Sequence, residues 1–403
     1  MRDATFIRRV QLRNYKSIEA CDVRLRPLMF LVGLNGAGKS NFLDALRFVS
    51  DALRNSLDHA LRDRGGIIEV RRRSGGGPTQ FGIRVDFVLA TGESGHYAFL
   101  IGPRSRASFQ VLSEECVVRG PEALKPETFF RVKAGLVSAS APVMPAASDD
   151  RLYLVSASGM PEFRGVFDAL QHMGFYSLSP ERMRDLQPPD AGDLLARDGS
   201  NIASMLDQVS KGSPEVKRRI ERYLERLAPG VHGVQVRVIG PRETIEFHQQ
   251  LRGAKEPWRF LAANMSDGTL RGLGILVALF QPAVTRLPVP LVGVEEPEMA
   301  LHPAAAHVLR ESLAEASRAT QVLVTSHSPD LLDDATLDVQ SMLAVVVDEH
   351  GTTLGPIEAT GRGKLRDRMC TAGDLLRRGE LLPEIRPSKA AAEQLPLFSA
   401  PAD

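Results

Sequence analysis

The amino-acid sequence predicts an α/β protein built around a mixed sheet, and three observations lead to this fold class. An apolar segment at 28–32 runs into a glycine-rich turn and then a helical pattern, which indicates a strand, a loop and a helix. Residues 269–325 alternate between helix and strand patterns, as a parallel sheet requires. Shorter alternating segments at the start of the chain indicate an antiparallel β subdomain.

The elements before residue 160 are expected in a simple order. Strands are expected at 7–12, 23–25, 28–32, 81–90 and 96–102, with a helix from residue 41 onward. Two glycine clusters at 65–77 favour a surface loop. The segment 120–160 is rich in Ala, Ser and Pro, which indicates an irregular insertion.

The elements after residue 160 include both helices and strands. Helices are expected at 160–172, 193–209, 214–228, 269–280 and 303–317, and strands at 231–240, 244–251, 289–294, 321–325 and 342–348. The expected domains are an N-terminal lobe at 1–118, an insertion and helical region at 119–230, a C-terminal lobe at 231–384 and a mobile tail at 385–403. Heptads that would form a long coiled coil are absent between the N- and C-terminal lobes.

Composition argues against several classes of protein. The formal net charge of +1 gives no electrostatic argument for binding nucleic acid or a membrane. Cys21, Cys116 and Cys370 lie far apart, which argues against a zinc site and a disulfide framework. The chain has no run of about 18 apolar residues and no signal peptide pattern, so we expect no membrane contact and a cytoplasmic location.

Residues 33–40, GLNGAGKS, match the phosphate-loop pattern G-x-x-x-x-G-K-[ST] in full. Glycines let the backbone wrap closely around phosphate oxygens, and the N-terminus of the following helix attracts anions. Lys39 is expected to reach the β- and γ-phosphates, and Ser40 to supply a hydroxyl to Mg²⁺. The alternative is a glycine turn with an incidental lysine, but the preceding strand and following helix favour a phosphate site.

A second apolar strand ends abruptly in Glu295, Glu296 and Glu298. Buried like charges are costly unless a cation neutralises them. We therefore expect Mg²⁺-nucleotide at Glu295, and we expect Glu296 to polarise a water molecule as a general base. The alternative is a solvated helix cap that begins at Pro297, which would not explain why an apolar strand ends there.

Two further segments complete an ordered series of motifs. Ser266, Asp267 and Gly268 open an apolar helix, and His327 directly follows another buried strand. Taken alone, the Ser-Asp pair is a common helix cap and a single histidine is unremarkable. The order of these motifs along the chain indicates a class of protein. Both follow the phosphate loop, and they lie on either side of the acidic strand end.

In that order the motifs resemble those of ABC-type ATPases of the RecF/SMC/OLD-like branch, in the group of AAA-family ATPases. VQLRNYKSI resembles the opening strand motif, GLNGAGKSN the Walker A motif and SDGTLR the signature motif. EEPEMALHP resembles Walker B with the D-loop, and TSHSPDLLD resembles the switch-histidine segment. The resemblance implies an ABC-type P-loop ATPase head with a helical insertion and no long coiled coil.

The resemblance also implies ATP and Mg²⁺ as cofactors and hydrolysis of ATP to ADP and phosphate. It implies that Glu296 activates water and that His327 senses the γ-phosphate, while Ser40 and Glu295 hold the metal. The implied nucleotide contacts are Asn35, Gly36, Gly38, Lys39, Ser40 and Asn41, with Ser266 and Gly268 facing the nucleotide of a second subunit.

Three positions depart from the family pattern. Glu295 stands where an aspartate is usual, which puts direct metal coordination in doubt, and Ala300 replaces a D-loop residue that is commonly glycine. The Q-loop glutamine is not identified by its surroundings, and Gln80 is a candidate.

The resemblance implies a homodimer on ATP binding that acts in DNA repair or anti-phage defence, with DNA or a separately encoded effector as partner. The alternative comes from another class of function. It is a slow nucleotide-sensing switch that regulates a partner protein without acting on DNA directly. A transporter subunit is disfavoured because SDGT departs from LSGGQ. A nuclease within this chain is disfavoured because too few residues follow His327 to form its domain.

Two surface features suggest partners. The basic runs at 71–73 and 217–219 are candidates for DNA contact, although a solvated face is the alternative. Residues 394–398, from Gln394 to Phe398, read QLPLF and resemble the peptide by which bacterial replication and repair proteins dock on the sliding clamp. The alternative is that Leu397 and Phe398 pack on this chain's own domain.

Overall fold

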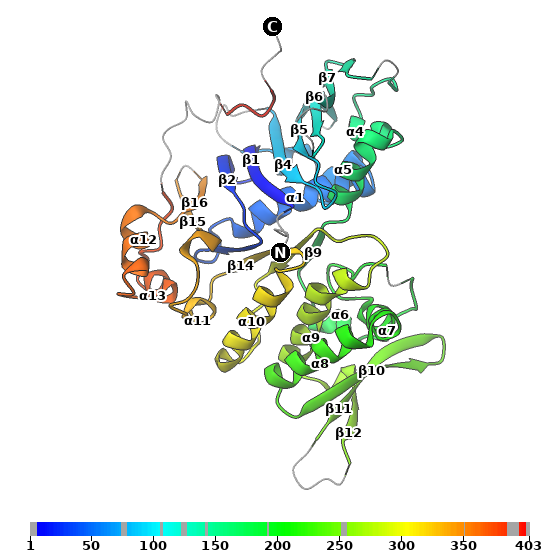
Figure 1. Cartoon of the computed structure of the whole chain (residues 1–403), viewed down its shortest axis with the longest axis vertical. Helices are drawn as coiled ribbons and strands as arrows, with labels where there is room; N and C mark the ends of the chain where they lie inside the picture. The colour runs from blue at the N-terminus through cyan, green and yellow to red at the C-terminus, as the bar shows by residue number, and fades with distance from the viewer. Residues whose placement is uncertain are drawn as a thin grey trace. The chain divides into compact units, whose positions relative to one another are not determined.

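The computed structural model, drawn in Figure 1, contains two compact units. The described residues are 6–73, 79–104, 108–121, 127–141, 144–191, 193–250, 256–349, 351–384 and 395–399. Of these, the P-loop unit takes those within Thr5–Met173, Asp338–Met369 and Arg378–Asp403. The signature unit takes those within Gly174–Leu337 and Cys370–Arg377.

The P-loop unit is built on a mixed sheet with the strand order β8-β7-β6-β5-β4-β1-β2-β16-β15-β3. Its strands are β1 Ile7–Tyr15, β2 Ile18–Arg24, β3 Leu28–Val32, β4 Phe81–Val88, β5 Ser94–Pro103, β6 Phe109–Arg119, β7 Thr128–Lys133, β8 Leu136–Ala139, β15 Met342–Asp348 and β16 Gly351–Pro356. Only the β15–β3 and β16–β2 pairs of this series are parallel. The antiparallel N-terminal β subdomain is therefore confirmed.

Helix α1, Lys39–Arg54, packs its apolar stripe on this sheet (Figure 1). Phe48 is fully buried, and its ring centre lies 6.1 Å from that of Tyr15 and 5.5 Å from that of Phe81. Burying one large apolar side chain of this kind stabilises a fold by about 1.5–3 kcal/mol. The other helices of the unit are α2 Leu57–Arg62, α3 Ile67–Val70, α4 Tyr153–Ala157, α5 Pro161–Gln171 and α12 Ala359–Arg366.

The signature unit contains three parallel strands of the large sheet, in the order β14-β13-β9. β13, Leu291–Glu295, pairs with β14, Gln321–Ser326, and with β9, Gly174–Tyr176. Leu291 to Val294 are buried, as expected of a strand covered on both faces. The pairing places Glu295 opposite Thr325, so the carboxyl ends of β13 and β14 lie side by side.

Helices and a second sheet complete the signature unit. The helices are α6 Pro180–Arg184, α7 Ile202–Gly212, α8 Pro214–Leu227, α9 Asp267–Phe280, α10 Ala306–Ala316, α11 Pro329–Leu332 and α13 Ala372–Arg377. The strands β10 Val231–Ile239, β11 Arg242–Gln249 and β12 Trp258–Leu261 form an antiparallel sheet. The longest helix among the described residues is α1, with 16 residues, so the part of the chain described here contains no long coiled coil.

The structure differs from the expected elements in several places, and the strands β6, β9 and β16 were not expected at all. The helix expected at 193–209 begins only at Ile202, because Gly199 has a φ of +81° and the backbone before it forms a loop. The expected surface loop at 65–77 contains the short helix α3, and residues 74–78 lie outside the described residues. The insertion at 120–160 contains β7, β8 and α4, whose signals are too short to stand out in the sequence.

Part of the expected tail packs on the P-loop unit. Leu397 is only 3% exposed and lies over Gly82 of β4, where Arg84 Nη1 donates to its carbonyl at 3.0 Å. The backbone N–H of Ser399 donates to Glu115 of β6 at 3.0 Å. This burial favours packing on the chain itself over docking on a sliding clamp. Gln394 and the other residues at 385–394 and 400–403 lie outside the described residues.

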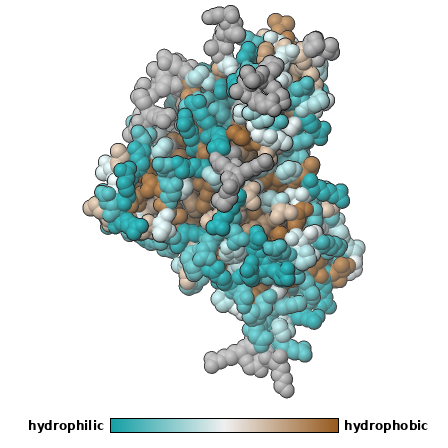
Figure 2. Space-filling view, viewed as in Figure 1, coloured by the Kyte–Doolittle hydropathy of each residue, from teal (hydrophilic) through white to brown (hydrophobic). Residues whose placement is uncertain are grey.

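Hydrophilic side chains cover most of the face drawn in Figure 2, with hydrophobic ones in small patches among them. Such scattered apolar residues are normal on a protein surface. None of the helices in the described ranges combines the length and apolar content that a membrane span requires.

Candidate functional site

The phosphate-loop pattern forms a turn between β3 and α1 in the P-loop unit. Asn35 and Gly36 are exposed in this turn, and Ser40 is exposed in the first turn of α1. Gly38 has a φ of +98°, and the Thr352 side chain fills the place where a Cβ would stand, so glycine is required here. The first N–H groups of a helix lack partners within the helix, which makes this turn suited to an anion.

Lys39 is folded back onto the loop. Its Nζ donates to the carbonyl oxygens of Gly33 at 2.9 Å and Leu34 at 3.0 Å, and the residue is 4% exposed. An ammonium group has three donors and a flexible stem, so phosphate oxygens can replace carbonyl oxygens as its partners. This geometry places the lysine ammonium beside the turn that is suited to an anion.

A chain of hydrogen bonds braces the loop from strand β16 and from the β1–β2 turn. Asn41 Nδ2 donates to Ser17 Oγ at 2.6 Å, and Ser17 Oγ lies 2.7 Å from Thr352 Oγ1. Thr352 Oγ1 in turn donates to the carbonyl of Ala37 at 2.9 Å. Asn41, expected to contact nucleotide, thus has its amide engaged in holding the loop.

Removing the Thr352 hydroxyl should weaken this brace. Thr352→Val keeps the shape of the side chain but leaves the buried Ala37 carbonyl without its donor, at a cost of about 1 kcal/mol. If the loop holds the nucleotide, the Kd for ATP should rise about fivefold, measured by equilibrium binding. Thr352→Ser, which retains the hydroxyl, should bind ATP nearly as the wild type does. Equal ATP affinity of the valine variant and the wild type would contradict a positioning role.

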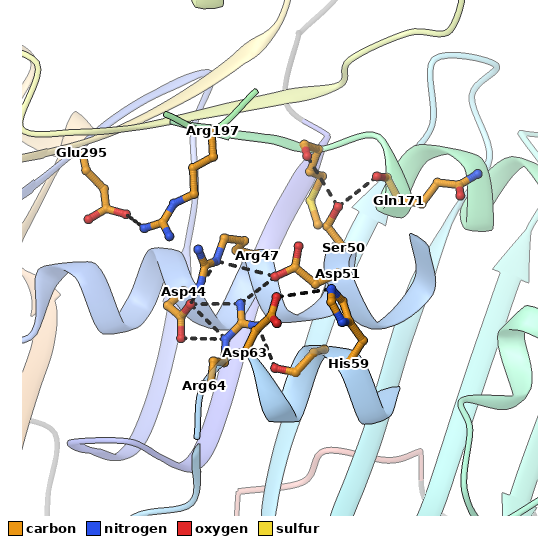
Figure 3. A network of polar contacts seen from close by, with 12 residues as sticks. Asp44, Arg47, Ser50, Asp51, His59, Asp63, Arg64, Gln171, Arg197 and Glu295 are labelled. Carbon is orange, nitrogen blue, oxygen red and sulfur yellow. Dashed lines mark hydrogen bonds and ion pairs between the residues drawn. The ribbon is translucent and has the colours of Figure 1, made fainter. Parts of the chain in front are cut away.

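A buried ion network fixes α1 behind the loop (Figure 3). Asp44 accepts from Arg64 Nε at 3.0 Å and from the Tyr15 hydroxyl at 2.8 Å, and it pairs with Lys16 at 2.5 Å. Burial alone would raise the pKa of Asp44, but Arg64, Lys16 and Arg47 together lower it below its ordinary value. The carboxylate therefore stays ionised and ties α1 to β1.

Glu296 follows the end of β13 in the signature unit. It has a φ of +43°, a left-handed conformation that residues other than glycine rarely adopt. Its N–H donates to the carbonyl of Thr325 at 3.0 Å and to Thr325 Oγ1 at 3.1 Å, which holds this conformation. Backbone strain of this kind concentrates at functional sites because the surroundings must enforce it.

His327 lies directly opposite Glu296. Its Nδ1 is 3.0 Å from Glu296 Oε1, an ion-pair distance when the imidazole is protonated. Both residues follow neighbouring parallel strands, so the sheet itself brings them together. The structure therefore unites the expected base and the expected γ-phosphate sensor at one strand edge.

Glu298 has a role that the sequence did not predict. It accepts from Ser326 Oγ at 2.6 Å and from the His327 N–H at 3.3 Å. Burial raises the pKa of Glu298. The third carboxylate of the strand end thus holds the histidine segment, and its place two residues after Glu296 was the only sequence signal.

The signature segment opens helix α9. Ser266 is exposed and caps the helix, with its Oγ accepting from the Thr269 N–H at 3.3 Å. A Cβ at Gly268 would collide with the carbonyl oxygen of Ala300, so only glycine fits this approach. Ala300 itself has a φ of +64°, in the left-handed region that favours glycine.

The expected metal ligands, Ser40 and Glu295, belong to different units. A hydroxyl and a carboxylate are hard oxygen donors, which is the ligand chemistry that Mg²⁺ prefers. Among the described residues, no group of three or more His, Cys, Asp or Glu side chains forms a metal site. Within its own unit Glu295 meets a cation that the sequence did not predict, Arg197, whose Nη2 donates to Glu295 Oε1 at 3.0 Å (Figure 3).

The basic runs proposed for DNA contact are largely paired with acids. Arg72 lies 2.8 Å from Glu19, and Lys217 lies 3.2 Å from Glu221 of the same helix. Arg219 of α8 also pairs, at 3.2 Å from Glu315. These pairs favour a solvated, self-neutralised face over a phosphate-binding surface.

A family model described as "AAA domain, putative AbiEii toxin, Type IV TA system" matches residues 28–333. A comparison with curated protein sequences gives no significant match.

Several solved structures resemble the fold of the chain. An SMC head bound to the C-winged helix domain of ScpA has a TM-score of 0.53 at 13% identity, covering 89% of this chain and 99% of that one. An Smc head with an extended coiled coil, bound to the C-terminal domain of ScpA derived from Pyrococcus furiosus, has a TM-score of 0.53 at 11% identity, covering 90% and 99%. The SMC head domain from Thermotoga maritima has a TM-score of 0.42 at 13% identity, covering 88% and 100%.

Proposed function

The chain belongs to the AAA-domain family whose model it matches, and from that premise we propose that it binds ATP and hydrolyses it with Mg²⁺ as a nucleotide-gated dimer. The observation that carries the proposal is the Glu296–His327 pair at a strained strand end. The same chain supplies a complete phosphate loop with a buried lysine. We further propose a role in DNA repair or anti-phage defence, with a separately encoded effector as partner.

Each residue has a distinct task in this proposal. Lys39 and the N–H groups of the loop bind the phosphates, and Ser40 and Glu295 would hold Mg²⁺, which neutralises charge on the phosphates when bound. Glu296 accepts a proton from the attacking water, and its fixed backbone aims the carboxylate. His327 orients that carboxylate or the γ-phosphate, held in place by Glu298.

The dimer is proposed because of the place of Ser266. It is exposed at the N-terminus of α9, where phosphate is attracted, and in this class of ATPase the signature serves the nucleotide of the second subunit. A symmetric pair would then have two composite sites. Each site would combine the phosphate loop and acidic strand of one subunit with the signature of the other.

Mixing inactive variants tests hydrolysis and dimerisation together. Lys39→Ala and Ser266→Arg chains should each be inactive alone, because one lacks the phosphate lysine and the other blocks the signature. In a heterodimer one site is intact, so an equal mixture should recover about a quarter of the wild-type sites. The measurement is release of phosphate from ATP in the presence of Mg²⁺.

The matched control mixes Lys39→Ala with Glu296→Gln. Lys39 and Glu296 of one subunit serve the same composite site, whereas the signature comes from the other subunit. Each site of the heterodimer therefore carries one of the two defects, and the mixture should stay inactive. Recovery in the control mixture, or its absence in the test mixture, would count against shared sites.

A slow nucleotide-sensing switch that regulates a partner without acting on DNA is the second candidate. Two observations support it. Glu295 pairs with Arg197, and a metal ion would have to disrupt this pair before hydrolysis. The basic runs that could contact DNA are paired with acidic residues. The rate of phosphate release separates the two functions, since a switch would hold ATP for far longer than a turnover enzyme.

A further inference from the structure

The Glu295 carboxylate is engaged by an arginine from a loop before α7. Arg197 Nη2 donates to Glu295 Oε1 at 3.0 Å, and the two side chains are 47% and 24% exposed. Figure 3 shows the guanidinium pointing at this carboxylate. The pair is accessible enough to open without unfolding the unit.

The position of Arg197 is set by the sheet that carries Glu295. Its carbonyl accepts from the N–H of Ser177 at 2.9 Å, just after β9. β9 pairs in parallel with β13, with Tyr176 opposite Val294. The arginine backbone is therefore fixed beside the end of the strand whose last residue is Glu295.

The loop itself is a built structure. Asn201 Oδ1 accepts from the Ala196 N–H at 2.7 Å, and its Nδ2 donates to the Leu194 carbonyl at 3.0 Å. The N–H of Ser179 donates to the carbonyl of Asp198 at 3.0 Å, beside the left-handed Gly199. Such a loop holds Arg197 at a defined place instead of leaving it to solvent.

We propose that Arg197 is a positioning residue that occupies the Glu295 carboxylate without nucleotide and is exchanged for Mg²⁺ when ATP binds. This inference rests on the proposed ATPase function. Mg²⁺ takes carboxylate oxygens at about 2.0–2.1 Å. A guanidinium already on the same oxygen therefore competes with the metal and repels it.

The exchange accounts for the glutamate at this position. Its side chain is one methylene longer than the usual aspartate, so its carboxylate extends farther from the strand toward the arginine. Without a cation, the strand end would carry Glu295, Glu296 and Glu298 close together. Arg197 therefore stabilises the empty state and sets the Mg²⁺ concentration at which nucleotide is held.

The test is a Mg²⁺ titration of the binding of a fluorescent ATP analogue, in a Glu296→Gln background so that hydrolysis does not interfere. Arg197→Ala should lower the Mg²⁺ midpoint about three- to tenfold, because the competing cation is gone. Arg197→Lys, which keeps the charge, should stay near the parent value. Should the alanine variant be unstable, Arg197→Gln gives the same test.

A matched arginine in the same unit serves as the control. Arg226 is 44% exposed and pairs with Glu311 at 2.6 Å, so Arg226→Ala removes a similar ion pair elsewhere. Its Mg²⁺ midpoint should equal that of the parent. A thermal melt of each variant separates a loss of stability from a shift in metal affinity.

Two results would overturn the inference. An unchanged midpoint in Arg197→Ala, or a raised midpoint with a lowered melting temperature, would leave Arg197 with a structural role only. If the parent protein binds the analogue equally with Mg²⁺ and with a chelator, the metal-dependent function fails as well. Measuring the parent protein with a chelator therefore shows whether the role of Arg197 alone is wrong or the Mg²⁺-dependent function is wrong as well.

Discussion

Replacing Lys39 by alanine is expected to abolish ATP binding at concentrations that saturate the wild type. Hydrogen bonds to charged groups contribute about 1.5–3 kcal/mol each, and this lysine would make two with the β- and γ-phosphates. The Kd for ATP should therefore rise by about 100-fold or more, measured by equilibrium binding with Mg²⁺. In the structure the same ammonium donates to the carbonyls of Gly33 and Leu34.

The control for this variant is another lysine of the P-loop unit. Lys364 lies on α12 and pairs with Glu380 at 2.6 Å, and its side chain is 37% exposed. Lys364→Ala removes an ammonium group without touching the loop, so its ATP affinity should match the wild type. Because Lys39 is buried, a thermal melt must show that Lys39→Ala remains folded. A folded Lys39→Ala protein with wild-type affinity would refute the phosphate-loop assignment.

Replacing Glu296 by glutamine is expected to preserve ATP binding and remove turnover. The amide has the shape of the carboxylate but cannot accept a proton from water, and general-base catalysis contributes about 10²–10⁴-fold to rate. The kcat for phosphate release should fall by that factor, while the Kd for ATP changes little. The backbone that aims this side chain is held by Thr325 and does not depend on the charge.

The matched control is Glu311→Gln, an exposed glutamate of α10 that pairs with Arg226. Its kcat should be unchanged, since its exposed carboxylate pairs with Arg226 and with none of the residues of the proposed site. If Glu296→Gln hydrolyses ATP at the wild-type rate, Glu296 is not the base and the strand end has another use.

Local sequence patterns predicted the parts of the fold that local physics determines. The strand at 28–32 and the helix after it were predicted because an apolar run, a glycine-rich turn and a helical stripe are all consecutive in the chain. The parallel pair β13 and β14 was predicted in the same way, from two buried apolar runs separated by a helix. Their shared edge then brings Glu296 and His327 together.

The missed features depend on contacts between segments that are distant in sequence. Arg197 was placed in an expected helix, and only the structure shows its loop bonded to the residues after β9. The turn-forming run of Asp198, Gly199, Ser200 and Asn201 was the signal that could have revealed this loop. The role of Thr352 could not be predicted, because it reaches the phosphate loop from a strand more than 300 positions away.

The tail shows a different limit of sequence reasoning. QLPLF resembles a docking peptide, but resemblance cannot say whether the apolar residues are free. In the structure Leu397 is buried over Gly82, and Arg84 donates to its carbonyl. The space above Gly82 exists only because glycine lacks a side chain, which the tail sequence alone does not reveal.

The most direct measurement is the identity of the nucleotide that stays on the protein after incubation with Mg²⁺ and radiolabelled ATP. The wild type should retain ADP, Glu296→Gln should retain intact ATP, and Lys39→Ala should retain neither. This pattern requires the phosphate loop and the acidic strand end to act on the same nucleotide, one to hold it and the other to cleave it. Retention of ADP by Glu296→Gln, or of ATP by Lys39→Ala, would contradict that claim.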